Sequence, residues 1–105
     1  MNTNKFIFIG DSLIFGYGVN KNKCWVELFK NYTLSSNLNF SIVNKGINGN
    51  TTTDMLNRFT EDVTIYNPKS IFIMGGTNDL LSNRSLNLIL DNIELLIKEA
   101  LTKTN

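Results

Sequence analysis

The sequence contains no histidine, one cysteine (Cys24) and one proline (Pro68) among its 105 residues. A single cysteine cannot form an intramolecular disulfide, so nothing indicates an oxidised, disulfide-stapled scaffold. The lack of histidine removes the residue type that most often acts as a general base near neutral pH. The single proline and the even composition leave no sign of a linker, and we expect one domain over residues 1–105.

Charge of one sign and long hydrophobic runs are also lacking. The net charge is +1 and no run of Lys or Arg occurs, which argues against nucleic acid or an anionic membrane as a partner. The apolar run nearest the N-terminus is only residues 6–9, too short for a signal-peptide core or a membrane span. We therefore expect a cytoplasmic protein without a membrane span.

Three short apolar runs predict β-strands, at residues 5–9, 40–43 and 70–74. Each is a continuous run rather than an alternation, which is typical of strands buried on both faces of a parallel sheet. Between and after them, apolar residues at helical spacing predict helices at the ranges 23–32, 52–59 and 85–101. The order β-α-β-α-β-α predicts an α/β fold with a parallel sheet and helices on both faces.

The apolar stripes of these helices are the expected core. The first helix contributes Trp25, Val26, Leu28 and Phe29, the second Met55, Leu56 and Phe59, and the third Leu86, Ile89, Ile93, Leu96, Ile97 and Ala100. Thr51, Thr52 or Thr53 can cap the second helix, and Ser85 the third. Cys24 is expected to be a small packed residue rather than a reactive thiol.

Polar signatures follow all three predicted strands. They are Gly10-Asp11-Ser12-Leu13, residues 44–52, and Gly75-Gly76-Thr77-Asn78-Asp79. Taken singly, such residues are typical of turns and caps. In a parallel sheet, however, the three strand ends share one edge, where ligands bind. A serine nucleophile there needs donors aimed at the developing oxyanion, and a glycine N–H and an asparagine amide can supply them.

These blocks resemble those of the GDSL esterase/lipase family, also called SGNH hydrolases. Residues 10–13 resemble its first block, residues 44–52 its second and residues 75–79 its third, in the family's order. The resemblance implies a flavodoxin-like three-layer α/β/α sandwich that hydrolyses small-molecule carboxylic esters through an acyl-enzyme, without a metal or other cofactor. It implies Ser12 as nucleophile, with the N–H groups of Ser12 and Gly49 and the side chain of Asn78 as the oxyanion hole, and Asp11 supporting the nucleophile loop.

The family's fourth block, Asp-x-x-His, has no counterpart in this sequence. Lys45 and Asp79 fall near the same edge, but neither is the residue type that usually serves as the base of such a serine. We therefore expect a single domain truncated before that block, with about three of the usual five strands. An uncovered third strand would leave a sheet edge open to self-association.

Three other classes of protein were compared with the sequence: a non-catalytic fragment, a nucleotide-binding module and an α/β-hydrolase. A non-catalytic fragment or pseudoenzyme, acting as a binding or complementing half-domain, remains the alternative to an esterase. A nucleotide-binding module lacks support, because neither G-x-x-x-x-G-K-[ST] nor G-x-G-x-x-G follows the first strand. The G-x-S-x-G elbow of α/β-hydrolases is broken by Ile14, which stands where the second glycine belongs.

Overall fold

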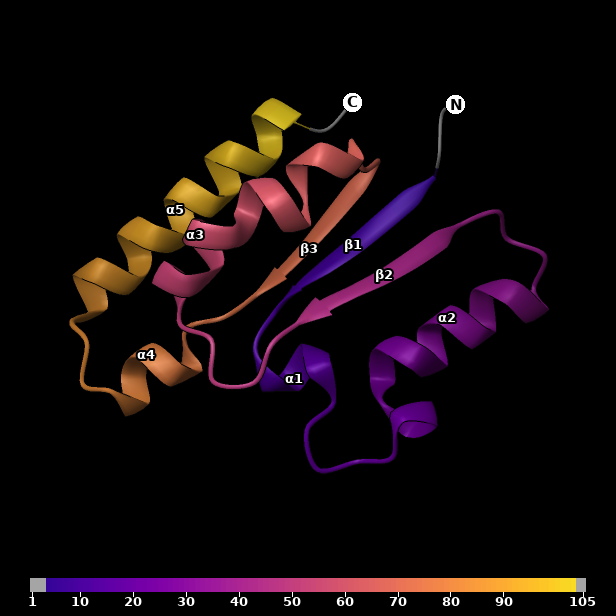
Figure 1. The fold of residues 1–105 in the computed structure, drawn as a ribbon, viewed down its shortest axis with the longest axis horizontal. Helices are drawn as coiled ribbons and strands as arrows, with labels where there is room; N and C mark the ends of the chain where they lie inside the picture. Colours follow the sequence, from indigo (N-terminus) through magenta and orange to yellow (C-terminus); the bar gives the residue numbers. More distant parts are fainter. Residues whose placement is uncertain (1–3, 104–105) are drawn as a thin grey trace.

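The computed structural model describes residues 4–103. In this range three parallel strands form one sheet with the order β2-β1-β3 (Figure 1). The strands are β1 (Lys5–Gly10), β2 (Ser41–Gly46) and β3 (Ser70–Met74). The register places Gly10 opposite both Gly46 and Met74, so the three strands end at the same level. This confirms the α/β fold class with a parallel sheet.

Helices of very different lengths connect and follow the strands. They are α1 (Ser12–Phe15), α2 (Trp25–Ser35), α3 (Thr52–Asp62), α4 (Thr77–Leu81) and α5 (Leu86–Lys103), with 3-10 turns η1 (Lys21–Lys23) and η2 (Thr64–Tyr66). The three long helices were predicted from periodicity, although α2 begins two residues later than expected. The short helices α1 and α4 were not predicted, because one turn carries no periodic signal.

The β2 strand extends beyond its predicted apolar core. It was expected over residues 40–43 and instead runs through Asn44 and Lys45 to Gly46. These three residues pair with Phe8, Ile9 and Gly10, so the hydrogen-bonded ladder of β1 continues the strand where apolar residues end. Tertiary pairing, rather than local composition, therefore decides where β2 stops.

The sheet carries a separate core on each face. On one face Ile7 and Ile9 pack with Met55, Phe59 and Val63 from α3 and its C-terminal end, and with Leu96 from α5. On the other face Phe8 packs with Ile14, Cys24, Val26 and Ile42. The layers are therefore α3 and α5, then the sheet, then α1 and α2. Cys24 is buried as expected, and its Sγ donates to the Ile14 carbonyl at 3.6 Å.

The expected core stripe of α2 is only partly buried. Val26 is buried, but Trp25, Leu28 and Phe29 are exposed, and so is Phe72 of β3, which was expected to be covered on both faces. Phe8 and Phe72 stack with ring centroids 5.2 Å apart, and Trp25 meets Phe72 edge-on at 5.6 Å. The reason is that α2 lies beside β2, and no helix among residues 4–103 lies above β3 on this face (Figure 1).

The long helix α5 also departs from its expected burial. Ile89 and Leu96 are buried, whereas Leu86 and Ile97, predicted on the same stripe, are exposed. The helix packs chiefly against α3, which covers only part of its apolar surface. Within residues 4–103, neither α5 nor any other helix is long and apolar enough to cross a membrane.

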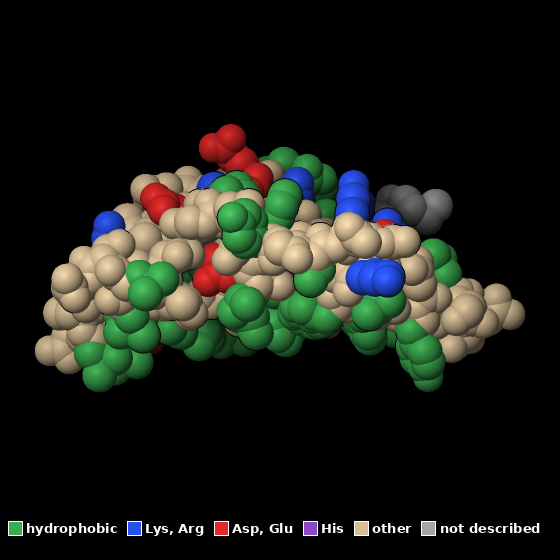
Figure 2. All heavy atoms as spheres, turned by 90° about the horizontal axis from the view of Figure 1, so that it is seen from below, with side chains coloured by type: hydrophobic (Ala, Val, Ile, Leu, Met, Phe, Trp, Pro, Cys, Tyr) green, Lys and Arg blue, Asp and Glu red, His purple; other side chains and the backbone are tan. Residues whose placement is uncertain are grey.

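The molecule is flat rather than round. Its principal extents are 43 × 33 × 17 Å and its radius of gyration is 14.1 Å, against about 13 Å for a compact domain of this length. Seen edge-on, hydrophobic side chains gather along one broad side and most charged side chains lie toward the other (Figure 2). The described chain thus exposes more apolar surface on one side than a compact domain would.

Side-chain caps fix the starts of α3 and α5. The Thr51 hydroxyl accepts from the Asp54 N–H at 3.2 Å, while Asp54 Oδ2 accepts from the Thr51 N–H at 3.0 Å, which is a capping box. The Ser85 hydroxyl accepts from the Leu88 N–H at 3.2 Å. Ser85 was predicted as a cap, and Thr51 is the one of the three predicted candidates, Thr51, Thr52 and Thr53, that caps α3.

A buried carboxyl group joins α4 to the start of α3. Asp79 has 0% of its surface exposed; its Oδ1 accepts from the Thr52 N–H at 2.9 Å and its Oδ2 accepts from the Thr52 hydroxyl at 2.7 Å. Asn92 of α5 donates through Nδ2 to the Thr52 and Thr53 hydroxyls, each at 3.0 Å. Three helices are therefore bonded at one buried point, which fixes α4 relative to the loop before α3.

We expect Asp79→Ala to lower the free energy of unfolding by about 3 kcal/mol, because it leaves the buried N–H of Thr52 without an acceptor. Urea unfolding followed by circular dichroism measures the change. Asp91→Ala, at an exposed position on α5, is the matched control and should change stability by less than about 0.5 kcal/mol. Equal effects of the two substitutions would contradict this assignment.

Candidate active site

Ser12 is the first residue of α1, directly after the end of β1. Asp11 is the N-cap of this helix: its Oδ1 accepts from the Leu13 N–H at 3.0 Å, and its backbone carbonyl accepts from Ile14 and Phe15. Asp11 is 1% exposed, and within residues 4–103 its Oδ2 has no hydrogen-bond partner. The predicted nucleophile therefore lies half-buried on a one-turn helix whose cap is the predicted supporting residue.

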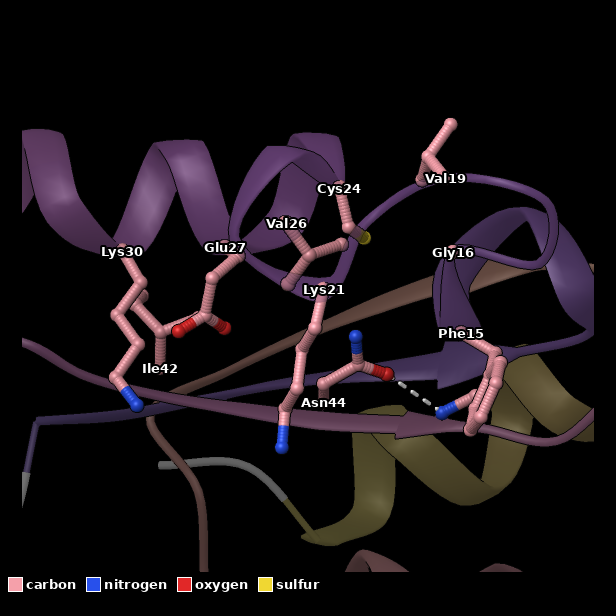
Figure 3. Close-up of a pocket in the computed structure, with 11 residues that line it drawn as sticks. Phe15, Gly16, Val19, Lys21, Cys24, Val26, Glu27, Lys30, Ile42 and Asn44 are labelled. Carbon is pink, nitrogen blue, oxygen red and sulfur yellow. Dashed lines mark hydrogen bonds between the residues drawn. The ribbon is translucent and has the colours of Figure 1, made fainter.

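Two hollows adjoin α1. A shallow one of about 290 Å³ is lined by Ser12 together with Leu13, Tyr17 and Trp25, among others. A larger one of about 480 Å³ lies between α2 and β2, where the side chains of Lys21, Glu27 and Lys30 extend over β2 (Figure 3). None of the predicted site residues lines the larger hollow, so only the shallow one adjoins the candidate nucleophile.

The end of β2 packs directly against α1. A Cβ at Gly46 would overlap the backbone of Phe15, so only glycine allows this approach. One residue later, the Ile47 N–H donates to the Gly10 carbonyl at 3.1 Å. The loop that follows β2 is thereby bonded to the last residue of β1, two residues before Ser12.

Gly49 lies in a tight turn in this loop. The Asn50 N–H donates to the Ile47 carbonyl at 3.2 Å, and Gly49 has φ +80°, as the third residue of a type II turn requires. A side chain at Gly49 would meet no atom within 4 Å, so the position is open rather than packed. The positive φ explains why this position is a glycine, and the residue is exposed.

Asn78 bonds the third strand end to the same turn. It lies in the first turn of α4, and its Nδ2 donates to the Asn50 carbonyl at 2.9 Å. An amide carries two N–H donors, so this contact leaves a second one. The structure therefore links the loops that carry Ser12, Gly49 and Asn78 through two hydrogen bonds, Ile47 to Gly10 and Asn78 to Asn50.

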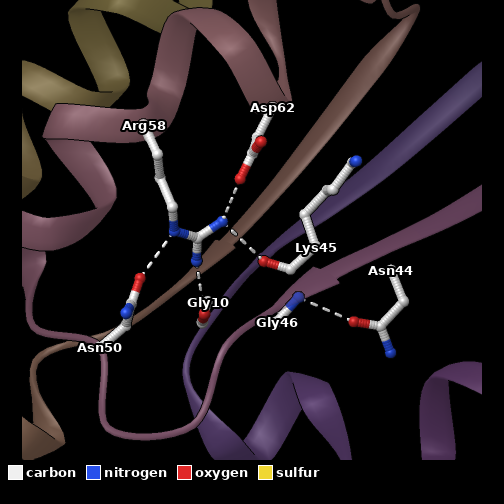
Figure 4. A network of polar contacts seen from close by, with 7 residues as sticks. All are labelled: Gly10, Asn44, Lys45, Gly46, Asn50, Arg58 and Asp62. Atoms are coloured by element: carbon white, nitrogen blue, oxygen red, sulfur yellow. Dashed lines mark hydrogen bonds and ion pairs between the residues drawn. The ribbon is translucent and has the colours of Figure 1, made fainter.

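Arg58 of α3 ties these loops to the strand ends (Figure 4). Its Nη2 donates to the Gly10 carbonyl at 2.9 Å, its Nη1 to the Lys45 carbonyl at 2.9 Å and its Nε to Asn50 Oδ1 at 2.6 Å. Asp62, one helical turn further on, accepts from Nη1 at 2.8 Å. One guanidinium thus bonds the ends of β1 and β2 and the turn that contains Gly49.

Sequence reasoning missed Arg58. Its neighbours on α3 gave an ordinary amphipathic pattern, and an arginine on the polar side of such a helix is usually solvated. The available signal was the Arg58 and Asp62 pair at i,i+4 together with unsatisfied carbonyls expected at two strand ends. The pair identifies its backbone partners, Gly10 and Lys45, only when the position of α3 over the sheet is known.

The other candidate proton acceptors lie in structural roles. Both oxygens of Asp79 bond Thr52 in the buried contact described above. The ammonium of Lys45 lies over the ring of Tyr66, 5.2 Å from its centroid, and so points toward η2 rather than toward α1. Neither residue is placed to receive a proton from Ser12.

This chain resembles known proteins in sequence and in fold. The chain is 46% identical over 55 residues to the uncharacterized lipoprotein YqeF of Bacillus subtilis (strain 168), covering 52% of this chain and 21% of YqeF. It is 28% identical over 95 residues to an arylesterase of Vibrio mimicus, covering 90% of this chain and 48% of the arylesterase. The psychrotrophic esterase EstA from Pseudoalteromonas sp., in a structure inhibited by monoethylphosphonate, superimposes with a TM-score of 0.88 at 25% identity, covering 95% of this chain.

The chain covers 55% of EstA, 48% of the arylesterase and a smaller part of YqeF, so it spans about half or less of these relatives. The model of the GDSL-like lipase/acylhydrolase family matches residues 8–105, which include Ser12, Gly49 and Asn78. A match over nearly the whole sequence, on a fold shared with an esterase of known structure, shows that this chain belongs to the GDSL-like lipase/acylhydrolase family.

Proposed function

We propose that this chain carries the nucleophile and the oxyanion hole of a serine ester hydrolase. Ser12 Oγ attacks the carbonyl carbon of a small-molecule ester, the ester C–O bond breaks, and the alcohol leaves with the serine proton. Water then hydrolyses the acyl-serine to the carboxylic acid and free Ser12. The N–H groups of Ser12 and Gly49 and the side-chain amide of Asn78 stabilise the tetrahedral oxyanion. Asp11 holds the short helix that presents Ser12.

The observation that carries this proposal is the bonding between the three strand-end loops. Ile47 donates to Gly10 and Asn78 donates to Asn50, so residues 37 and 66 positions away from Ser12 in sequence share one edge of the sheet with it. An oxyanion hole acts because its donors are held before reaction, and each donor lowers the barrier by about 3 kcal/mol. If Ser12, Gly49 and Asn78 served only as separate turn or cap residues, hydrogen bonds between their loops would not be needed.

The proposed site has no histidine to accept the proton of Ser12. Ser12 must lose its hydroxyl proton as it attacks, and the sequence contains no histidine. Asp79 and Lys45 are engaged elsewhere, as described above. Without a base, an oxyanion hole and substrate binding retain about 10³-fold acceleration over water. We therefore expect weak reactivity from this chain by itself.

A phosphonate ester with a p-nitrophenolate leaving group should form an adduct at Ser12 slowly, because no base assists the attack, while the oxyanion donors stabilise the phosphonyl oxygen as they would a tetrahedral intermediate. EstA in its monoethylphosphonate-inhibited structure makes this class of probe suitable. Intact-mass spectrometry should show the adduct in the wild type and in Ser70→Ala, at an exposed serine. Ser12→Ala should show none, and equal labelling of Ser12→Ala would remove Ser12 from the proposed role.

Replacing Asn78 by Ala should slow this labelling by about 100-fold, because one oxyanion donor is lost. Asn87→Ala, at an exposed asparagine on α5, should react like the wild type. Urea unfolding of both variants separates a lost donor from a lost fold, since Asn78 also bonds Asn50. A wild-type labelling rate in a folded Asn78→Ala variant would show that this side chain does not stabilise the oxyanion.

A further inference from the structure

The tip of the turn after β2, formed by Asn48 and Gly49, is exposed. Among the described residues, neither the Asn48 side chain nor the peptide group that joins Asn48 to Gly49 makes a hydrogen bond. Type I and type II turns share their outer hydrogen bond, here from Asn50 to Ile47, and differ in the orientation of this central peptide. The peptide at the tip can therefore rotate while the turn stays closed.

The two residues at the tip are also a reactive pair. Asn48 is the only asparagine in the sequence that precedes a glycine. Asparagine is a thermolabile residue, because the main-chain nitrogen of the next residue can attack its side-chain carbonyl carbon and close a five-membered ring. Glycine has no side chain to obstruct this attack, and a Cβ at Gly49 would meet no atom within 4 Å. Nothing at the tip therefore blocks ring closure.

Asn50, two residues further along the same loop, provides a contrast. Its Oδ1 accepts from Arg58 Nε at 2.6 Å, so its side chain is held (Figure 4). The N–H of the next residue, Thr51, donates to Asp54 Oδ2 at 3.0 Å. Both groups that would have to react at Asn50 are thus bonded, and the β-branched side chain of Thr51 crowds the nitrogen. Asn50 is therefore an internal control for Asn48.

We propose that Asn48 and Gly49 form a site of spontaneous modification. The Gly49 nitrogen bonds to Asn48 Cγ, the Cγ–Nδ2 bond breaks, and Nδ2 leaves as ammonia with the Gly49 amide proton. Water then adds to either carbonyl of the resulting succinimide, opens the ring and restores the Gly49 N–H. One product has an aspartyl residue at position 48. The other has an isoaspartyl residue, in which the main chain runs through the former side chain.

The isoaspartyl product changes the position of Gly49. Its main chain is longer by one methylene carbon, yet both ends of the turn are fixed. Ile47 donates to the Gly10 carbonyl at 3.1 Å, and Asn50 is held by Arg58. The extra atom must therefore be accommodated at the tip, which displaces the Gly49 N–H. This consequence rests on the proposed function, in which that N–H is an oxyanion donor, and it makes the modification a slow and lasting loss of reactivity.

The modification is tested by ageing the chain in warm buffer and mapping its peptides by mass spectrometry at intervals. Protein-isoaspartate methyltransferase marks the isoaspartyl product. We expect loss of ammonia, then isoaspartate, to accumulate at Asn48 and not at Asn50. An unchanged Asn48, or equal modification of Asn50, would overturn the proposed site whatever the role of Ser12.

The effect on reactivity is tested by treating the same aged samples with the phosphonate probe. The isoaspartyl fraction should label at Ser12 about 100-fold more slowly than the rest, because one oxyanion donor is displaced. Asn48→Ser, which has no carboxamide, should keep its labelling rate when aged alongside and thus controls for general decay. Fresh Asn48→Asp, with the new charge but an unaltered main chain, should label close to the wild-type rate.

The outcomes separate this inference from the proposed function. Fast labelling of fresh wild type together with equally fast labelling of the isoaspartyl fraction would overturn the loss of the donor. Labelling of fresh Asn48→Asp as slow as that of the isoaspartyl fraction would assign the effect to charge and overturn the displacement of Gly49. Fresh wild type that does not label at Ser12 would contradict the proposed function and, with it, the loss of reactivity, while the peptide map alone decides the modification.

Discussion

The guanidinium of Arg58 holds together the strand ends on which the candidate site is built. It donates to the carbonyl of Gly10, to that of Lys45 and to Asn50 Oδ1, and Asp62 holds it in place. Carbonyls at the end of a parallel sheet have no further ladder partner, and an arginine can satisfy several at once in a fixed plane. Together with the Ile47 to Gly10 hydrogen bond, these contacts set the separation of the loops that carry Ser12 and Gly49.

The polar groups at the strand ends are well bonded, whereas much apolar surface beside β3 is exposed. At the carboxyl ends of the strands, Asp79, Asn78 and Arg58 satisfy buried polar groups from loops far apart in sequence. Beside β3, apolar side chains such as Phe72 and Trp25 are exposed. The proposed nucleophile and oxyanion donors lie at this sheet edge, whereas the sequence offers no histidine as their base.

Most of the fold was predictable because apolar runs and helical periodicity are local signals. They predicted the three strands, the three long helices, the cap at Ser85, a threonine cap among residues 51–53, and the shared edge of the strand ends. The burial of α2 and α5 was predicted only in part, because a stripe in sequence does not reveal whether anything covers it: Trp25, Phe29 and Ile97 are exposed. Arg58 was missed for the related reason that its partners are backbone groups from other segments. The placement of Ser12, Gly49 and Asn78 on linked loops follows the motif spacing, whereas their chemical roles remain proposals.

The most direct test of this account is a crystal structure of the Ser12 phosphonyl adduct. The account predicts a phosphonyl oxygen within about 3 Å of the N–H groups of Ser12 and Gly49 and of Asn78 Nδ2, with the Arg58 contacts to Gly10, Lys45 and Asn50 intact. An adduct whose oxygen faces solvent, or one in which Gly49 and Asn78 lie out of hydrogen-bonding range, would contradict the claim that the linked strand ends form an oxyanion hole.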